Sequence, residues 1–248
     1  MSVVSQSSRA VRLLAPSLAS LRERPGPRKT TGDAGEYSGR PSSLEERANP
    51  RAEHIPQLME NRDIPISLVG AWTTLLGKKT NTATHIWEYE CFNDVAQSVE
   101  KMATDKSWQE FTRAGAKFLH STCNQIVLPF TFFQSSTGET TPTQGGQRRV
   151  FEMRSYELKP GSMIEWGQEW AKGIQYRREE AVGGWFSQIG HMHSVHHLWV
   201  YKSLQDRDET RQSAWAFPGW DECVRRTVPL IHEMESSILL PTAYSPLQ

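Results

Sequence analysis

The chain has 248 residues, with 28 basic and 28 acidic side chains, three cysteines and no net formal charge. This balance argues against nucleic acid or an anionic membrane surface as a partner, because both attract chains with a basic excess. The scattered cysteines have no metal-ligand spacing and are typical of reduced thiols inside a cell, and no apolar run approaches the roughly 18 residues that cross a bilayer.

Residues 1–50 differ in composition from the rest of the chain. Basic and serine residues dominate the first 30 positions, where Glu23 is the one acid. Apolar residues recur there at helical spacing: Val11, Leu14, Leu18 and Leu21. A basic, amphipathic, acid-poor start is typical of a mitochondrial presequence. Pro16 disfavours the helix, and a basic tail without a targeting role is the alternative. We expect residues 1–50 to be presequence-like and largely disordered.

A fixed offset of 112 positions relates two parts of the chain. It repeats tryptophan at two independent places. The repeated pairs are His85 and His197, Trp87 and Trp199, Tyr89 and Tyr201, Trp108 and Trp220, Ile126 and Ile238, and Pro129 and Pro241. The length allows two domains of about 100 residues each. The sequence therefore predicts two copies of one module.

The first copy is expected over residues 51–134, and its sequence pattern lacks one of the strands found in the second copy. Strands are predicted at 66–76, 83–91 and 126–133, with a helix over 93–124. The offset maps the second copy's first strand onto residues 39–46 (GRPSSLEE), which do not resemble a strand. The first module is therefore predicted to be shortened, unless another segment replaces that strand. A flexible linker is expected at residues 135–149.

The second copy, residues 150–248, is easier to divide into elements. Strands are predicted at 150–158, 184–190, 194–202 and 236–240. Ser162 and Glu165 have the spacing of a capping box for a helix that ends near residue 180, and a second helical region covers 206–229 with a break at Pro218. This βαββαβ order is ferredoxin-like, an α+β fold with an antiparallel sheet and helices on one face. Packing two such sheets face to face would cover the bare apolar faces of both.

The second copy also carries a family resemblance. The segments FEMRSYELKPGSMIEWGQEWAKGIQYR (151–177), AVGGWFSQIG (181–190), VHHLWVYKSLQ (195–205), TVPLIHEMES (227–236) and SPLQ (245–248) resemble the NIPSNAP family. SLVGAW (67–72) and HIWEY (85–89) extend the likeness into the first copy, but not upstream of about residue 54.

The resemblance implies tandem dimeric α/β-barrel modules, with antiparallel sheets inside and helices outside. It further implies a mitochondrial location, in the matrix or retained at the surface after damage, and no established enzyme activity. A role in quality control is also implied, in which members recruit selective-autophagy receptors and ubiquitin-like autophagy modifiers to damaged mitochondria.

Two sets of residues are candidate binding sites. Trp72 and Leu75 fit the aromatic-x-x-aliphatic pattern of short autophagy-modifier motifs, which bind as an added strand. They lie beside the incomplete part of the first sheet, where a strand edge is expected to be exposed. Tyr156, His197 and Trp199 are expected to line a pocket between the second sheet and its helices.

The only histidine cluster in the sequence does not predict a metal site. On a strand, His193 and His197 share one face and His196 lies on the other, with no carboxylate or thiolate nearby. We expect no catalytic residues, metal or cofactor. A small-molecule or haem-binding enzyme or carrier of the dimeric α/β-barrel type is the alternative function. A homo-oligomer is an open possibility.

Overall fold

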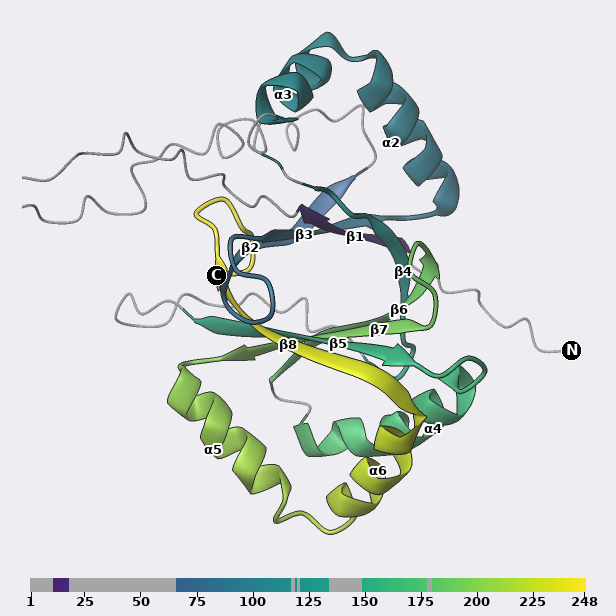
Figure 1. Cartoon of the computed structure of the whole chain (residues 1–248), viewed down its shortest axis with the longest axis vertical. Coiled ribbons are helices and arrows are strands. Elements are labelled where there is room, and N and C mark those ends of the chain that lie inside the picture. Colours follow the sequence, from purple (N-terminus) through teal and green to yellow (C-terminus); the bar gives the residue numbers. More distant parts are fainter. Residues whose placement is uncertain (1–10, 18–65, 117–118, 120, 134–148, 178–179) are drawn as a thin grey trace, which may run out of the picture.

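The computed structural model describes residues 11–17, 66–116, 119, 121–133, 149–177 and 180–248, in which the strands close into one antiparallel barrel (Figure 1). Around the barrel the order is β1 (Val11–Ser17), β3 (Ala83–Tyr89), β2 (Ser67–Leu76), β8 (Ile231–Pro241), β5 (Val150–Leu158), β7 (Ser194–Tyr201), β6 (Ala181–Ile189) and β4 (Gln125–Pro129).

Each half of the barrel is a four-stranded sheet with the ferredoxin-like strand order. The second half runs β8-β5-β7-β6 and the first half β4-β1-β3-β2, so the fourth strand of each lies beside its first. The halves are joined by hydrogen bonds along both edges, between β2 and β8 and between β4 and β6. The predicted tandem α/β-barrel fold is confirmed. The two sheets do not merely face each other, because they are parts of one closed sheet.

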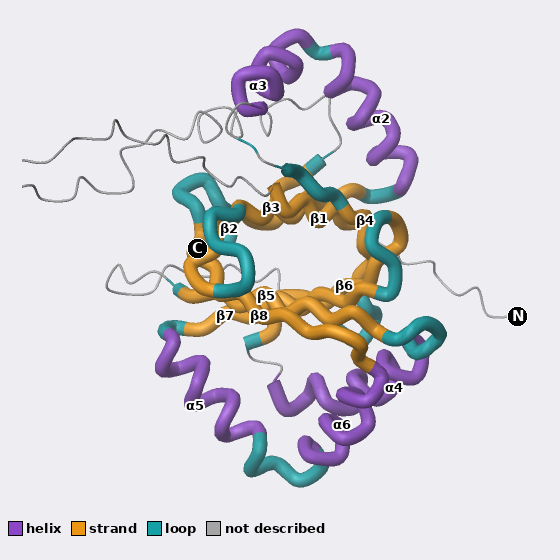
Figure 2. The backbone as a smooth tube through the Cα atoms, in the orientation of Figure 1, coloured by secondary structure: helices purple, strands orange, loops and turns teal. Residues whose placement is uncertain are grey.

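The helices lie outside the barrel (Figure 2). The first half carries α2 (Phe92–Thr104) and α3 (Lys106–Ala116), and the second half carries α4 (Met163–Gly173), the 3-10 turn η1 (Ile174–Arg177), α5 (Leu204–Ala214), α6 (Trp220–Thr227) and η2 (Val228–Leu230). None of the helices in the described ranges is long and apolar enough to cross a bilayer.

The prediction that the first sheet lacks its first strand is wrong. β1 occupies that position, paired with β3 from Val11 to Ser17 and with β4 through Arg12, Leu13 and Leu14. The helical spacing seen over residues 9–21 therefore does not give a helix at 11–17, because the free edges of β3 and β4 pair with this segment instead. Residues 39–46 and 135–148 lie outside the described residues, as do most of residues 1–50.

Several predicted element boundaries also need correction. The helix predicted over 93–124 is divided at Asp105, whose carboxylate accepts the backbone N–H of Trp108 at 2.9 Å and caps α3. Ser162 does not form the predicted capping box, because its hydroxyl donates to the carbonyl of Lys159 at 2.7 Å. The closing strand β8 begins at Ile231, five residues before the predicted start.

One part of the barrel interior is filled by apolar side chains. Trp72 and Trp185 are completely buried there, together with Ile86, Val127, Phe151, Leu198 and Leu239. The Trp72 indole lies directly over Gly70, where an added Cβ would approach it to 2.1 Å. Glycine is therefore required at position 70 for this tryptophan to fit.

The C-terminal tail folds back onto the first sheet. Ser245 Oγ accepts the backbone N–H of Ala71 at 3.0 Å, and the Tyr244 hydroxyl lies 2.9 Å from His85 Nε2. The Tyr244 ring also stacks on His85. His85 and His197 occupy the same position in the repeat, but only His85 meets the tail, so the two copies differ at this point.

Candidate functional site

The predicted pocket residues Tyr156, His197 and Trp199 do meet between the second sheet and its helices. His197 is completely buried on β7, and α4 covers it. Aromatic rings surround it at centroid distances of 5.0 to 6.0 Å: Phe133, Tyr156, Trp166, Trp170 and Trp199. These side chains belong to one compact core cluster, so the residues expected to line a pocket instead fill it.

His197 is held in its neutral form by this surrounding. Burial lowers the pKa of His197 well below its usual value, and the charges of Arg154, His196 and Arg177 lower it further. Neither ring nitrogen has a hydrogen-bond partner in the described part of the chain. No group of three or more His, Cys, Asp or Glu residues able to hold a metal occurs among the described residues. We therefore assign His197 to packing.

The other tryptophans of the repeat are divided between the two modules. Trp220 on α6 packs against Trp170 at 6.1 Å and belongs to the same cluster. Trp87 lies with the first sheet, and Trp108 pairs with Phe111 on α3. The sequence repeat therefore corresponds to equivalent positions in two modules, not to one shared pocket.

A cavity of about 460 Å³ opens at one end of the barrel. Residues from both halves line its wall, and most of them are polar: Thr74, Lys78, Lys79, Thr82, Thr84, Cys123, Gln125, Met153, Ser155, Tyr156, Glu157, His191, Ser194, His196, Glu233, Glu235, Ser237 and Leu239. Tyr156 borders the cavity although its ring packs on the helix side of the sheet. Drug-sized ligands occupy pockets of about 300–1,000 Å³, so this volume is sufficient for a small molecule.

His196 connects three strands at the wall of this cavity. Its Nδ1 lies 2.8 Å from Ser155 Oγ on β5, and its Nε2 lies 2.7 Å from Gln125 Oε1 on β4. An amide oxygen only accepts hydrogen bonds, so Nε2 carries the proton and Nδ1 accepts from the serine hydroxyl. The period-2 alternation of β7 had placed His196 opposite His197, but nothing in the sequence indicated its partners Ser155 and Gln125.

The Ser155–His196 pair is poorly suited to nucleophilic catalysis. Burial lowers the pKa of His196 to about 4, with a further contribution from His191. An effective general base has a pKa near the operating pH, and a base with a pKa of 4 removes a serine proton weakly. The partner of Nε2 is a neutral amide, which does not stabilise an imidazolium as a carboxylate does. The arrangement favours binding over proton transfer.

The rim of the cavity carries exposed charges. Lys78 Nζ lies 2.8 Å from Glu233 Oε1, and His191 Nε2 lies 3.5 Å from Glu157 Oε2. The hydrogen bond and charge of Glu233 raise the pKa of Lys78, and Lys78 in turn lowers the pKa of Glu233. Both partners are mostly exposed, and such pairs contribute little to stability. Their role is to make the entrance polar.

The expected short motif at Trp72 and Leu75 has no exposed strand edge. β2 is paired with β3 on one side and with β8 on the other. Trp72 is completely buried, while Leu75 is 44% exposed. An aromatic anchor must leave its own core to fill a partner's pocket, and this one fills the barrel interior. The two residues therefore do not form a docking motif in this fold.

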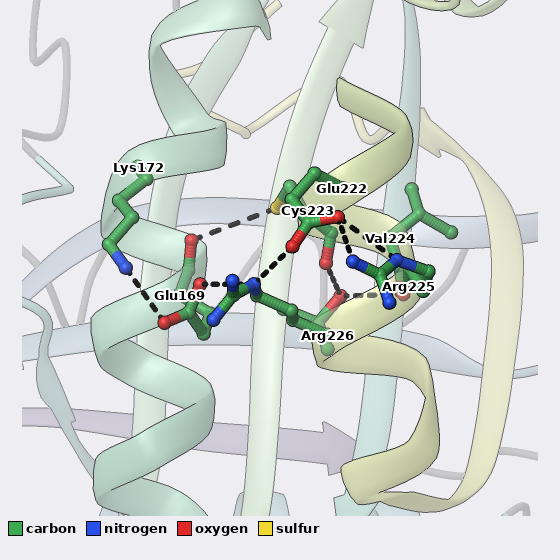
Figure 3. A network of polar contacts seen from close by, with 8 residues as sticks. Glu169, Lys172, Glu222, Cys223, Val224, Arg225 and Arg226 are labelled. Carbon is green, nitrogen blue, oxygen red and sulfur yellow. Dashed lines mark hydrogen bonds and ion pairs between the residues drawn. The ribbon is translucent and has the colours of Figure 1, made fainter. Parts of the chain in front are cut away.

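A charged network between α4 and α6 is also set aside as a binding site (Figure 3). Glu169 accepts from Lys172 at 2.7 Å, and Glu222 pairs with Arg225 and Arg226. Cys223, one of three free cysteines, directs its Sγ toward the carbonyl of Glu169 at 3.7 Å. Because these charges already satisfy one another, the network joins two helices without leaving groups for a ligand.

Comparison with known proteins places this geometry in a family. Protein NipSnap homolog 2 of Homo sapiens is 42% identical over 215 residues, which are 86% of this chain and 73% of that protein. Protein NipSnap of Drosophila melanogaster is 40% identical over 216 residues, 86% of this chain and 77% of that protein. An anthrone oxidase-like protein has a similar fold, with a TM-score of 0.57 at 10% identity over 98% of this chain and 95% of its own.

The family likeness begins further upstream than the sequence patterns indicated. A model of the NIPSNAP family matches residues 36–134 and 151–246, and so includes residues 39–46. The first matched segment contains β2, β3 and β4 of the first half, while β1 lies upstream of it, and the second segment contains nearly all of the second half. This chain belongs to the NIPSNAP family.

Proposed function

We propose that this chain is a non-enzymatic mitochondrial protein that acts as a binding platform in mitochondrial quality control. It recruits selective-autophagy receptors and ubiquitin-like autophagy modifiers to damaged mitochondria. Support comes from membership of the NIPSNAP family and from the presequence-like composition of the first 30 residues. The observation that most favours binding over catalysis is the solid packing around His197, which leaves the helix-side pocket filled.

An exposed aromatic loop between α5 and α6 is the surface that we assign to this role. Trp215 is 60% exposed and Phe217 is 49% exposed. Their inner edges rest on buried or half-buried rings: Trp215 meets Trp220 at 6.3 Å, and Phe217 stacks on Tyr176 at 5.9 Å. Aromatic side chains that are supported in this way but remain open to solvent are typical anchors of protein interfaces.

The proposal is tested with the full chain carrying a fluorescent protein on a flexible C-terminal linker. In cells treated with an uncoupler, the wild-type fusion should mark mitochondria and collect a labelled autophagy modifier there. The W215A/F217A double variant should still reach mitochondria but collect at least several-fold less modifier. I164A removes another exposed apolar side chain, 75% exposed on α4, and should behave as wild type.

Each part of the proposal fails separately in this experiment. A diffuse cytosolic signal from the wild-type fusion would contradict the mitochondrial location. Mitochondrial signal without modifier would contradict the platform role. Equal recruitment by wild type and the double variant would place the contact on another surface.

A second candidate function is binding of a small molecule in the barrel-end cavity. The supporting observation is its volume of about 460 Å³ together with the converging polar groups of Ser155, His196 and Gln125. The fold likeness to an oxidase-like protein concerns architecture alone, because the identity is 10%.

This candidate predicts a ligand-dependent change of thermal stability. Menadione and haem serve as probes, and a ligand at 100 times its Kd should raise the Tm by about 5 °C. H196A should lose that rise because it removes a wall residue of the cavity. H232A changes an exposed histidine on β8 outside the cavity and should retain it. No shift with either probe, or an equal shift in both variants, would contradict this function.

A further inference from the structure

Four arginines belong to β5, η1 and α5, and α5 lies outside the barrel on the side of the second sheet (Figure 1). Arg154 projects from β5, Arg177 from η1, and Arg207 and Arg211 from α5. The last two are four residues apart and so lie on one face of their helix. Carboxylates would be expected around these four arginines, because like charges that lie close together repel one another.

Glu152 is the hub of this arginine cluster. Its carboxylate is completely buried and accepts Arg207 Nε at 3.0 Å and Arg207 Nη2 at 2.7 Å. It also accepts Arg154 Nη1 at 3.0 Å, Ser236 Oγ at 2.6 Å and the Tyr201 hydroxyl at 3.3 Å. Five hydrogen bonds to two oxygens use all the acceptor capacity of one carboxylate, which has about four lone-pair sites. Glu152 therefore has little left to offer the other two arginines.

Arg177 is buried without a carboxylate partner. It is 3% exposed and lies over the Trp199 ring at 4.2 Å. One terminal nitrogen donates to the Tyr201 hydroxyl, but its Nε has no hydrogen-bond partner within the described residues. A ring face and one hydroxyl compensate a buried guanidinium only partly, because buried charges normally pair with an opposite charge.

Arg211 is the least satisfied member of the cluster. It is half-buried, and its guanidinium has no hydrogen bond or ion pair with any described residue. Burial lowers the pKa of Arg211, and the charges of Arg154, Arg177 and Arg207 lower it further, whereas Glu152 raises it. Arg211 lies one helical turn after Arg207, on the same face of α5, and α5 contacts both η1 and β7.

The charges of the cluster do not balance. Within the described part of the chain, Glu152 is the one carboxylate with a hydrogen bond to any of the four arginines. Four guanidinium groups against one carboxylate leave three positive charges in excess. An anion with several acceptor oxygens would pair with the unused N–H groups of Arg177 and Arg211 together. Guanidinium groups recognise phosphate in this way, through two parallel hydrogen bonds.

We propose that Arg177 and Arg211, supported by Arg154 and Arg207, form a binding site for a small phosphate-bearing anion beside α5. Glu152 holds Arg154 and Arg207 in place and keeps the cluster folded when no anion is bound. The half-buried side chains of Arg154, Arg207 and Arg211 leave the site open to solvent on one side. The site is separate from the barrel-end cavity, whose wall includes none of the four arginines.

The test compares the Tm of the full chain in phosphate and in chloride at equal ionic strength. Inorganic phosphate and glycerol 3-phosphate are the two probes, which distinguish free phosphate from a phosphate ester. A probe at 100 times its Kd should raise the Tm of the wild-type protein by about 5 °C above the chloride value. A rise with either probe supports the site, and a rise with neither contradicts it.

Arg211→Gln is the deciding variant, because Arg211 has no hydrogen bond to lose on substitution. In chloride its Tm should equal or exceed that of wild type, since a like-charge repulsion is removed. In phosphate the rise should be absent, and broadening of the phosphate ³¹P signal by the protein should disappear as well. R113Q makes the same change on the exposed face of α3 and should respond as wild type. An equal phosphate response in R211Q and R113Q would overturn the proposal.

Discussion

Replacing Glu152 with glutamine is expected to lower the free energy of unfolding by about 3–5 kcal/mol, the usual cost of breaking a buried ion pair from one side. Glutamine keeps the size of the side chain but removes the charge that Arg154 and Arg207 face. Both arginines would remain beside Arg177 and Arg211 with no buried carboxylate among them. Urea unfolding at pH 7, followed by tryptophan fluorescence, measures the difference.

The effect of this substitution should depend on pH. Burial raises the pKa of Glu152, but the hydrogen bonds from Arg207 and Ser236 and the charges of Arg154 and Arg207 outweigh it and lower the pKa from 4.5 to about 2. A carboxylate with a lowered pKa stabilises the fold above its unfolded-state pKa and loses this contribution as pH falls through the folded-state pKa. The stability gap between wild type and E152Q should therefore be complete above pH 4.5 and close toward pH 2.

Glu222→Gln is the matched control for Glu152→Gln. Glu222 also pairs with two arginines, Arg225 and Arg226, but its side chain is 39% exposed. Exposed ion pairs contribute little to stability, so E222Q should change the free energy of unfolding little. If E152Q and E222Q had equal effects, Glu152 would not be the centre of a buried charge cluster.

Replacing Trp72 with alanine should cost about 3–5 kcal/mol of stability, as expected for removal of a large buried aromatic. Trp72 is completely buried in the barrel interior, where its ring meets Phe151 at 5.5 Å and covers Gly70. Leu75, three residues later on β2, is 44% exposed, so L75A should change stability by less than about 1 kcal/mol. Thermal and urea unfolding of both variants provide the comparison.

The same pair of variants decides between a core residue and a docking motif. A motif anchored by Trp72 and Leu75 would lose partner binding in both variants, with the fold of each unchanged. The barrel position predicts the reverse, with a large stability loss for W72A alone. A W72A protein as stable as wild type would show that Trp72 does not fill the barrel.

Patterns that depend on neighbouring residues predicted the second module well. Residues 150–158 form β5 with the expected boundaries, since this strand is bordered by a turn at Pro160 and alternates between two buried faces. The break at Pro218 separates α5 from α6, and β7 ends one residue before the expected position. In each case the signal lies in the segment itself.

Elements that depend on distant pairing were not predictable in this way. Residues 11–17 have an apolar spacing that also fits a helix, and the edges of β3 and β4 decide in favour of a strand. The early start of β8 has a similar cause: His232, Glu233 and Glu235 do not resemble a strand locally, but Glu233 and Glu235 line the barrel-end cavity and β5 pairs with the whole segment.

The same distinction between local patterns and distant contacts applies to the candidate sites. Helical and strand periodicity brought Tyr156, His197 and Trp199 together correctly, but periodicity does not tell a pocket from a packed core, which depends on the size of every neighbouring ring. The Ser155–His196–Gln125 chain spans three strands, and residues 41 and 71 positions apart meet only after the barrel closes. Nothing in the sequence around Glu152 indicated its role, because its partner Arg207 lies 55 positions away on α5.

The position of β1 has a consequence if the first residues act as a mitochondrial presequence, as we propose. The segment with the composition of a removable import signal is also the strand that lies between β3 and β4. A processing protease that cut after Ser17 would therefore open the closed sheet and expose unpaired backbone groups on both neighbours. The precursor and its processed product would then differ in fold as well as in length, and only the product would offer a seam that a strand from another protein could enter.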